Sequence, residues 1–327
     1  MPNLSHVPVE VALATYNGER YIRAQMDSIF AQSHQNFTVV ASDDGSTDTT
    51  VAVLQEYAER HPGRVRIVRT GGPRLGVKGN FSALLPHLTA EYVFFCDQDD
   101  VWLPWKIART LALLAELEPG APPETPLLAH TDLAVVDEEL GLVAASAMQH
   151  QNIDPSRDAF PLLLLSNVAT GCTVAVNRAL CRIAARVPPE AMMHDHWLVL
   201  VAASLGRVGY LDEPTVLYRQ HGRNTLGARP WNTRNNIARV RDTLFGAGRR
   251  EVLARYSRQA AVFLACYGDV LRPEDRRAAA ALANVGTAGR LDRFWPLVRH
   301  RVLLKGVLRN AALLYIVALR SARTPGE

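Results

Sequence analysis

The amino-acid sequence predicts an α/β fold, a doubly wound and mostly parallel sheet followed by a C-terminal helical region. Over the first 100 residues, short apolar segments alternate with helix-like segments, which is typical of repeated βαβ units. Polar clusters follow these apolar segments, where open α/β sheets bind their ligands. After about residue 226 only helix-like segments remain. We therefore expect two domains, at residues 1–226 and 227–327.

The first four predicted strands follow from runs of apolar and β-branched residues. They lie at residues 9–15, 37–42, 65–70 and 92–96, and the last of them is almost continuously apolar, as a strand buried on both faces should be. Helices are predicted between them at residues 21–32, 47–60 and 80–88. Ser46 or one of its neighbours can cap the second of these helices.

The rest of the chain continues this alternation and then changes. Further strands are predicted at residues 127–136, 172–176, 208–211 and 216–218, and further helices at 105–117, 162–166, 179–186 and 194–205. A proline-rich break covers residues 119–126. Helix-like patterns then occupy residues 235–244, 252–270, 276–284 and 293–319. The sequence contains no internal repeat at a solenoid period.

Composition excludes several classes of protein. With 327 residues, 48% of them hydrophobic, the chain has the composition of a globular protein. Its four cysteines have no C-x-x-C spacing, which argues against a structural zinc site or a redox pair. The N-terminus lacks the basic and apolar segments of a secretory signal, and no run reaches the roughly 18 apolar residues of a spanning helix. We therefore expect the active part in the cytoplasm.

Charge is unevenly distributed along the chain. Residues 1–225 contain 17 Lys and Arg against 25 Asp and Glu, whereas residues 226–327 contain 19 against 7. Basic regions bind nucleic acid, anionic lipid or acidic partners. Because no nucleic-acid-binding motif is present, we expect no nucleic acid and favour peripheral contact with an anionic membrane. The apolar segment 302–319, interrupted by Lys305, Arg309 and Asn310, fits a membrane interface, or packing on the body or on a second subunit.

Two polar clusters follow the first two predicted strands. Residues 15–19 could place hydroxyl, amide and aromatic groups against a nucleobase, or could form an ordinary turn capped by Asn17. The adjacent carboxylates of Asp43 and Asp44 could accept hydrogen bonds from a base and from ribose hydroxyls. Their alternative is an Asx turn that caps a helix. A single glycine, Gly18, is too few for a dinucleotide fingerprint or a phosphate loop.

Two further clusters could meet a diphosphate and a metal ion. Lys78 lies between Gly76 and Gly79 and could approach a diphosphate, or could be a solvated loop charge. Asp97, Asp99 and Asp100 follow the buried strand, and such crowded carboxylates repel one another unless a cation or hydrogen bonds compensate. Oxygen ligands favour Mg²⁺ or Mn²⁺ over zinc, and the D-x-D spacing suits a metal-diphosphate site. The alternative is a solvated acidic turn.

The last two candidate clusters lie later in the chain. Asp195 opens a predicted helix and could act as a general base toward an acceptor hydroxyl, or could simply cap that helix. His221 follows the last predicted strand and could complete a metal shell, although a histidine without a ligand role is the common case. Arg219 or Arg223 could contact phosphate.

Taken in order, these motifs resemble the family-2 glycosyltransferases of the GT-A fold. The segments are ATYNGERYI, SDDGSTDTT, LGVKGNF, FCDQDDVW, ATGCTVAVNR, HDHW and YRQHGRN. The likeness covers roughly residues 7–226 and is strongest to the bacterial rhamnosyltransferase-like branch that builds surface polysaccharide. It implies a nucleotide-diphospho-sugar site at the first two strand ends, a D-x-D metal site, and a later Asp as the base of a single inverting displacement.

The resemblance also assigns roles to individual residues. The donor-binding positions are Thr15, Tyr16, Asn17, Glu19, Asp43, Asp44, Lys78, Asn80, Asp97 and Gln98, of which Gln98 could equally support the turn. The metal ligands are Asp97, Asp99 and His221, with Asp99 the expected direct ligand, and the catalytic base is Asp195. His196 departs from the aromatic-rich Asp-Trp-Trp of the family, which leaves the acceptor contacts open. The Gln-x-x-Arg-Trp motif of processive synthases is missing, so one sugar per encounter is expected.

The implied reaction transfers a sugar, with dTDP-rhamnose suggested by the branch, to a glycan or lipid-linked glycan, and uses Mg²⁺ or Mn²⁺. It would occur in the cytoplasm or on the inner face of the cell membrane, in a chain that could form a homo-oligomer. Two alternatives remain open. A nucleotidyltransferase would need a glycine-rich phosphate loop after the first strand. A non-catalytic nucleotide-sugar-binding scaffold would work through the basic helical region.

Overall fold

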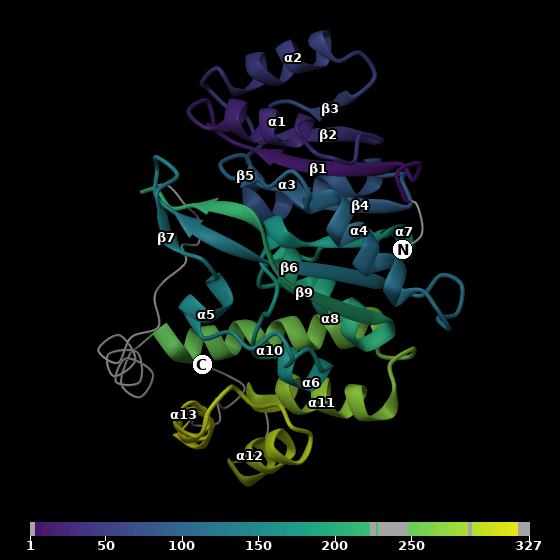
Figure 1. Cartoon of the computed structure of the whole chain (residues 1–327). Helices are drawn as coiled ribbons and strands as arrows, with labels where there is room; N and C mark the ends of the chain where they lie inside the picture. The colour runs from purple at the N-terminus through teal and green to yellow at the C-terminus, as the bar shows by residue number, and fades with distance from the viewer. Residues whose placement is uncertain (1–3, 223–226, 228–247, 287–289, 320–327) are drawn as a thin grey trace. The chain divides into compact units, whose positions relative to one another are not determined.

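The computed structural model describes residues 4–222, 227, 248–286 and 290–319 (Figure 1). The chain forms two compact units with interleaved boundaries, which are described separately. The first contains Met1–Pro155, Ala169–Val187 and Gly206–Arg229; the second contains Ser156–Val168, Pro188–Leu205 and Pro230–Glu327. The helix predicted at residues 235–244 lies outside the described residues, and the predicted boundary between a catalytic domain at 1–226 and a helical region at 227–327 stays a prediction.

The first unit is built on a mixed sheet whose long strand pairs are mostly parallel. Its order is β3 (Val65–Arg69), β2 (Phe37–Asp43), β1 (Val9–Thr15), β4 (Tyr92–Cys96), β8 (Ala175–Asn177), β6 (Leu127–Val136), β9 (Arg207–Arg219) and β5 (Val101–Trp102), with β7 (Leu142–Ala144) paired to β6. Strand β1 pairs in parallel with β2 and β4. Strand β8 runs antiparallel to both of its neighbours. Strands β1, β2 and β4 therefore end at one edge, at the point where the strand order reverses.

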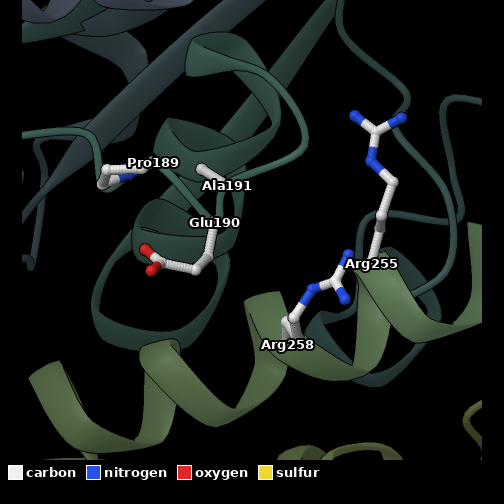
Figure 2. A pocket seen from close by; sticks show the side chains of 5 residues that line it. All are labelled: Pro189, Glu190, Ala191, Arg255 and Arg258. Carbon is white, nitrogen blue, oxygen red and sulfur yellow. The ribbon is translucent and has the colours of Figure 1, made fainter.

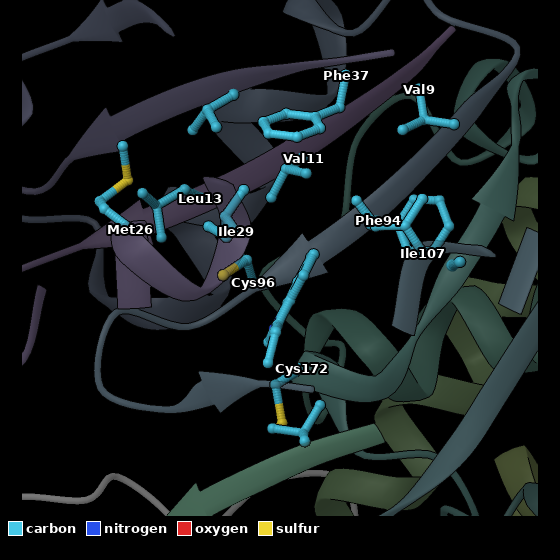
Figure 3. Close-up of a cluster of buried hydrophobic side chains, with 14 of the residues drawn as sticks. Val9, Val11, Leu13, Met26, Ile29, Phe37, Phe94, Cys96, Ile107 and Cys172 are labelled. Atoms are coloured by element: carbon cyan, nitrogen blue, oxygen red, sulfur yellow. The ribbon is translucent and has the colours of Figure 1, made fainter. Parts of the chain in front are cut away.

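Helices cover both faces of this sheet. They are α1 (Ile22–Phe30), α2 (Thr50–Arg60), α3 (Gly76–Leu84), α4 (Lys106–Leu117), α5 (Ala147–Gln151) and α7 (Arg178–Ile183), with 3₁₀ turns at Leu85–His87 and Gly171–Thr173. On one face, alternate residues of β1, Val9, Val11 and Leu13, join a core with Met26 and Ile29 of α1 (Figure 3). On the other face, Phe95 of β4 packs against Phe81 of α3, with ring centroids 5.7 Å apart. The doubly wound prediction is confirmed. Each such buried side chain contributes about 1.5–3 kcal/mol.

The second unit consists of helices. They are α6 (Phe160–Leu163), α8 (His194–Leu205), α10 (Gly248–Tyr267), α11 (Pro273–Ala283), α12 (Arg290–Arg299) and α13 (Val307–Leu319), with a 3₁₀ turn at Asn284–Gly286. Trp197 of α8 and Phe160 of α6 both pack on Phe263 of α10, with ring centroids 5.2 Å apart in each case. Within the described part of the chain, no helix combines the length and apolarity required to cross a bilayer.

Several predicted elements differ in the structure. The single helix expected at 293–319 is wrong, because the chain turns at Gly306, whose φ is +92°, and the Asn310 amide bonds the carbonyls of Leu304 and Gly306. The strands expected at 208–211 and 216–218 form one strand, β9, whose register against β6 shifts near Pro214. The strand predicted at 172–176 begins later, after a 3₁₀ turn.

Candidate active site

The carboxylate of Asp43 organises the turn at the end of β2. Its Oδ1 accepts hydrogen bonds from the backbone N–H groups of Gly45 at 3.0 Å and Ser46 at 2.7 Å. Its Oδ2 accepts from the hydroxyls of Thr15 at 2.8 Å and Ser46 at 2.5 Å. This is the Asx turn that the sequence left open, and it fixes the end of β1 against the end of β2. If Asp43 or Thr15 contacts the nucleotide-sugar donor, it must do so while it also makes these hydrogen bonds within the protein.

The neighbouring Asp44 sets the start of α3. Its carboxylate accepts from the N–H groups of Leu75 at 2.8 Å and Gly76 at 2.7 Å, and pairs with the Arg69 guanidinium at 3.0 Å. Helix α3 therefore begins at Gly76, earlier than the predicted residue 80. The prediction that Lys78 lies in a loop is wrong for this reason, since Lys78 lies in the first turn of α3.

Asn80, also predicted in the donor-binding loop, is buried in the second turn of α3. Its Oδ1 accepts from the Ser42 hydroxyl at 2.6 Å. Its Nδ2 donates to the carbonyl of Ser42 at 2.9 Å and to that of Thr15 at 3.3 Å. The side chain thus joins the carboxyl ends of β1 and β2, and its observed contacts position the strands.

The segment after β1 is bonded to the segment after β2. Asn17, at a left-handed φ of 48°, donates its N–H to the Ser46 hydroxyl at 2.8 Å, and its side-chain oxygen accepts from the Thr47 N–H at 2.8 Å. Glu19 accepts from the N–H of Thr49 at 3.2 Å, and its own N–H donates to Asp48 at 3.1 Å. Asp48 also accepts from the Thr50 N–H at 3.0 Å at the start of α2, whose N-cap residue is Thr49.

Gln98 connects the end of β1 to the turn after β4. Its Oε1 accepts from the Tyr16 N–H, and its Nε2 donates to the Tyr16 carbonyl, each at 2.8 Å. Gly18 leaves room for this amide, because a Cβ at residue 18 would lie only 2.3 Å from Gln98 Oε1. The Tyr16 ring is half-buried, and the Arg74 guanidinium lies 4.0 Å from the centroid of the ring. Sequence reasoning gave Arg74 no role, because nothing local to it indicates that contact.

The acidic turn after β4 contains two groupings. Asp99 Oδ2 lies 2.8 Å from His221 Nε2, which brings together two of the three predicted metal ligands. Possible ligand atoms of Asp97, Asp100 and Cys172 all lie within 4.8 Å of one another. Burial and the charges of Asp99 and Asp97 raise the pKa of Asp100 well above its ordinary value. Burial also raises the pKa of the Cys172 thiol, which disfavours thiolate ligation.

The residues around Asp99 fit a divalent ion that prefers oxygen and imidazole ligands. Neighbouring ligand atoms of an octahedral ion with bonds of about 2.1 Å lie about 3 Å apart. The 2.8 Å separation of Asp99 Oδ2 from His221 Nε2 is close to this spacing. The Asp99 carboxylate and the His221 imidazole are therefore compatible with Mg²⁺ or Mn²⁺ as a pair of ligands.

Tyr21 and Arg219 hold His221 in place. The Tyr21 and His221 rings stack with centroids 4.8 Å apart, and the Arg219 guanidinium lies 4.8 Å from the Tyr21 centroid. Arg219 is buried, donates its Nε–H to the Asp99 carbonyl at 3.0 Å, and donates its backbone N–H to Asp100 at 3.1 Å. Its observed contacts are therefore within the protein, and Arg223 lies outside the described residues.

A buried lysine lies beneath this turn. Lys106 is fully buried, its ammonium is 4.9 Å from the Trp102 ring centroid, and Nζ donates to the Thr215 hydroxyl at 3.4 Å. Burial lowers its pKa to about 8, opposed by the nearby Cys172, Cys96 and Asp100. Lys106 was not among the residues predicted from the sequence, where it is a single lysine at the start of a helix-like segment.

In the second unit, Asp195 lies in the first turn of α8 and is largely buried. Its Oδ1 accepts from the His196 N–H at 2.6 Å. His196 itself is buried, with Nε2 2.7 Å from the Leu163 carbonyl oxygen and Nδ1 3.4 Å from Gln259 Nε2. Burial lowers the pKa of His196 to about 4, so the ring is neutral at pH 7. These contacts give His196 a packing role within this unit.

The segment before α8 also lines an open pocket of about 380 Å³ in the second unit (Figure 2). Pro189, Glu190 and Ala191 form one wall, and Arg255 and Arg258 of α10 form the other. The two guanidinium groups lie on the α10 side and the Glu190 carboxylate on the opposite side in Figure 2. The pocket contains none of the predicted site residues.

Comparison with known proteins relates this arrangement to one family. The model described as Glycosyl transferase family 2 matches residues 10–121. The chain is 26% identical over 230 residues to the dTDP-rhamnosyl transferase RfbG of Shigella flexneri, covering 66% of this chain and 74% of that protein. It is 26% identical over 222 residues to an uncharacterized glycosyltransferase of Nostoc sp., covering 66% of each.

Solved structures show the same fold at low sequence identity. S. aureus TarS in complex with UDP-GlcNAc superposes with a TM-score of 0.54 at 16% identity, covering 95% of this chain and 90% of that one. The mannosyltransferase PcManGT of Pyrobaculum calidifontis, in complex with GDP-Man and Mn²⁺, gives a TM-score of 0.53 at 17% identity, covering 98% and 87%. The predicted GT-A fold is confirmed.

Proposed function

Because the chain belongs to the family-2 glycosyltransferases, we propose that it transfers a sugar from a nucleotide-diphospho-sugar to a hydroxyl acceptor with inversion at the anomeric carbon. The observation that carries the proposal is the turn after β4, where Asp99 meets His221 at 2.8 Å, at the sheet edge where β1 and β2 also end. A nucleotidyltransferase and a non-catalytic scaffold are not favoured, because the family comparisons give glycosyltransferases.

We further propose the donor, the acceptor and the cellular location of the reaction. The likeness to RfbG supports dTDP-rhamnose as the donor. The acceptor is a glycan or lipid-linked glycan in bacterial surface polysaccharide synthesis, and one sugar is added per encounter. The reaction takes place in the cytoplasm, with the chain in peripheral contact with the inner face of the membrane, as a single chain or a homo-oligomer.

In the proposed mechanism, residues at the ends of β1, β2 and β4 bind the donor and the metal ion, and a residue at the start of α8 is the base. Residues 15–19 and 43–46 shape the donor site. Asp97, Asp99 and His221 would hold Mg²⁺ or Mn²⁺, and the bound ion would neutralise charge on the nucleoside diphosphate leaving group. The acceptor oxygen bonds to the anomeric carbon as the bond from that carbon to the diphosphate oxygen breaks. Asp195, in the first turn of α8, takes the proton of the acceptor hydroxyl.

The Asp195→Asn substitution tests the base. We expect transfer to fall by at least about a hundredfold, because no carboxylate remains to take the proton, while donor affinity is unchanged. Release of dTDP from dTDP-rhamnose with Mn²⁺ and an acceptor measures transfer, and calorimetry measures donor binding. Glu190→Gln, an exposed acid in the same unit, is the control. Loss of donor affinity with intact transfer chemistry would overturn the role of Asp195.

The His221→Asn substitution tests the metal ligands. We expect Mn²⁺ affinity, measured by electron paramagnetic resonance without donor, to fall roughly tenfold or more. His87→Asn, which changes an exposed histidine of the same unit, should leave it unchanged. Equal Mn²⁺ affinity in His221→Asn and the unmodified chain would remove His221 from the proposed shell.

A further inference from the structure

Helices α12 and α13 of the second unit leave large apolar side chains outside the folded core. Trp295 is 61% exposed, Val307 85%, Leu308 71% and Tyr315 45%. On α13, Leu308, the exposed Ala311 and Tyr315 recur at intervals of three and four residues, so they share one helix face. These five residues are called the α12–α13 apolar surface.

The same helices are firmly packed on their other side. Leu297 of α12 and Ala312, Leu313 and Val317 of α13 are almost completely buried, as is Val302 in the segment between the two helices. The exposed side chains are therefore additional to those that the fold needs for its core.

The turn between the two helices is fixed as well. The Asn310 side chain bonds both the N–H and the carbonyl of Leu304 at 2.8 Å, and Arg157 donates to the Leu303 carbonyl at 3.0 Å. These hydrogen bonds fix the backbone at the start of α13, where the side chains of Val307 and Leu308 are exposed to solvent. Exposed apolar patches on an ordered surface are typical of interaction sites.

The charges around this surface indicate the partner. Residues 294–319 contain four Arg and Lys and no Asp or Glu. Arg299 and Arg301 are exposed beside the turn. Exposed Trp and Tyr, aliphatic side chains and surrounding cations are the combination that binds an anionic lipid interface. A second copy would bring an equally basic surface to this one, and the two would repel each other.

We propose that the α12–α13 apolar surface docks on an anionic lipid bilayer, with Val307 and Leu308 inserted below the headgroups and Arg299 and Arg301 against lipid phosphates. This inference names the surface and the lipid chemistry behind the membrane contact in the proposed function. It depends on that contact, but not on the donor or the reaction.

Vesicle co-sedimentation of the full chain tests the surface. We expect binding to vesicles of phosphatidylcholine with phosphatidylglycerol and little binding to phosphatidylcholine alone. Val307→Ser/Leu308→Ser should lower the partition coefficient roughly tenfold or more, because two exposed aliphatic side chains no longer enter the bilayer. Val270→Ser, which removes an apolar side chain 67% exposed in the same unit, should have no effect.

Three further measurements separate the possible outcomes. Arg299→Gln/Arg301→Gln should reduce the preference for anionic vesicles while keeping the thermal unfolding midpoint. Bromine-labelled acyl chains should quench tryptophan fluorescence in the unmodified chain and much less in Trp295→Phe. Donor binding by calorimetry should be unchanged in every surface variant, so that a failure of docking and a failure of the proposed reaction are distinguishable.

Several results would overturn the docking proposal. They are equal binding to neutral and anionic vesicles, no binding to either, and unchanged partition of the Val307→Ser/Leu308→Ser variant. A change of oligomeric state in light scattering without vesicle binding would instead assign the surface to a second copy.

Discussion

The contact between Gly18 and the Gln98 amide leads to a quantitative prediction. In Gly18→Ala, the added Cβ would lie 2.3 Å from Oε1, 2.4 Å from Cδ and 2.9 Å from Nε2 of Gln98, so the amide has to move. The movement breaks both 2.8 Å hydrogen bonds to the Tyr16 backbone. At about 0.5–1.5 kcal/mol each, their loss should lower the free energy of unfolding by about 1–3 kcal/mol.

The same geometry predicts that the penalty disappears when Gln98 is shortened. All three of the nearest atoms to the added Cβ belong to the Gln98 side chain beyond its own Cβ. In a Gln98→Ala background, Gly18→Ala should therefore be neutral or stabilising by up to about 1 kcal/mol, since alanine reduces the entropy of the unfolded chain.

Urea unfolding of the two single variants and the double variant measures this coupling as a double-mutant cycle. A penalty for Gly18→Ala that is the same in both backgrounds would refute the reasoning, since it would show that the Gln98 amide is not what Gly18 accommodates. Calorimetry with donor on the same variants would report whether the turn after β1 contributes to donor binding.

Two further predictions concern buried charge. Burial lowers the pKa of His130 to about 4, below the unfolded value of 6.5, so the unfolded chain binds the proton first and stability is lost as the pH falls from 6.5 to 4. His130→Phe should reduce this loss of stability by about 1.4 kcal/mol per pH unit, measured by urea unfolding at several pH values. An unchanged dependence of stability on pH would contradict this prediction. Asp44→Asn removes the buried carboxylate that pairs with Arg69 and weakens the hydrogen-bond acceptor at the start of α3. Urea unfolding at pH 7 should therefore show that the free energy of unfolding falls by about 3 kcal/mol. A decrease below about 0.5 kcal/mol would contradict this account.

The strands near the site were predictable because their signal is local. Strands β1, β4 and β6 have the predicted bounds, because each is rich in apolar and β-branched residues and is followed by polar or turn-forming residues. The start of α3 was not predictable, because its N–H groups are capped by Asp44, which lies 31 residues earlier than Leu75. Strands β5 and β7, of two and three residues, are too short to give a periodic pattern.

The site shows the same division between local and distant causes. The sequence indicated which strand ends carry polar side chains, and the structure brings Asp99 and His221 together as expected. It did not indicate that Asn80 and Gln98 bond the backbone of neighbouring strand ends, because those partners lie far away in the chain. Lys106 illustrates the remaining limit, since a single lysine reveals its burial only when the elements around it are assembled.

The interleaved boundaries of the second unit have a consequence for synthesis. Its helices α6 and α8 precede α10 by tens of residues, yet Phe160 and Trp197 find their partner in Phe263 of α10. Ten of the twelve residues of α8 are buried, so the helix has no exposed face that would keep it soluble by itself. During translation, α8 must therefore remain without its final packing until the ribosome has delivered α10. A chain that stops near residue 226 would leave this apolar helix without cover and prone to aggregate.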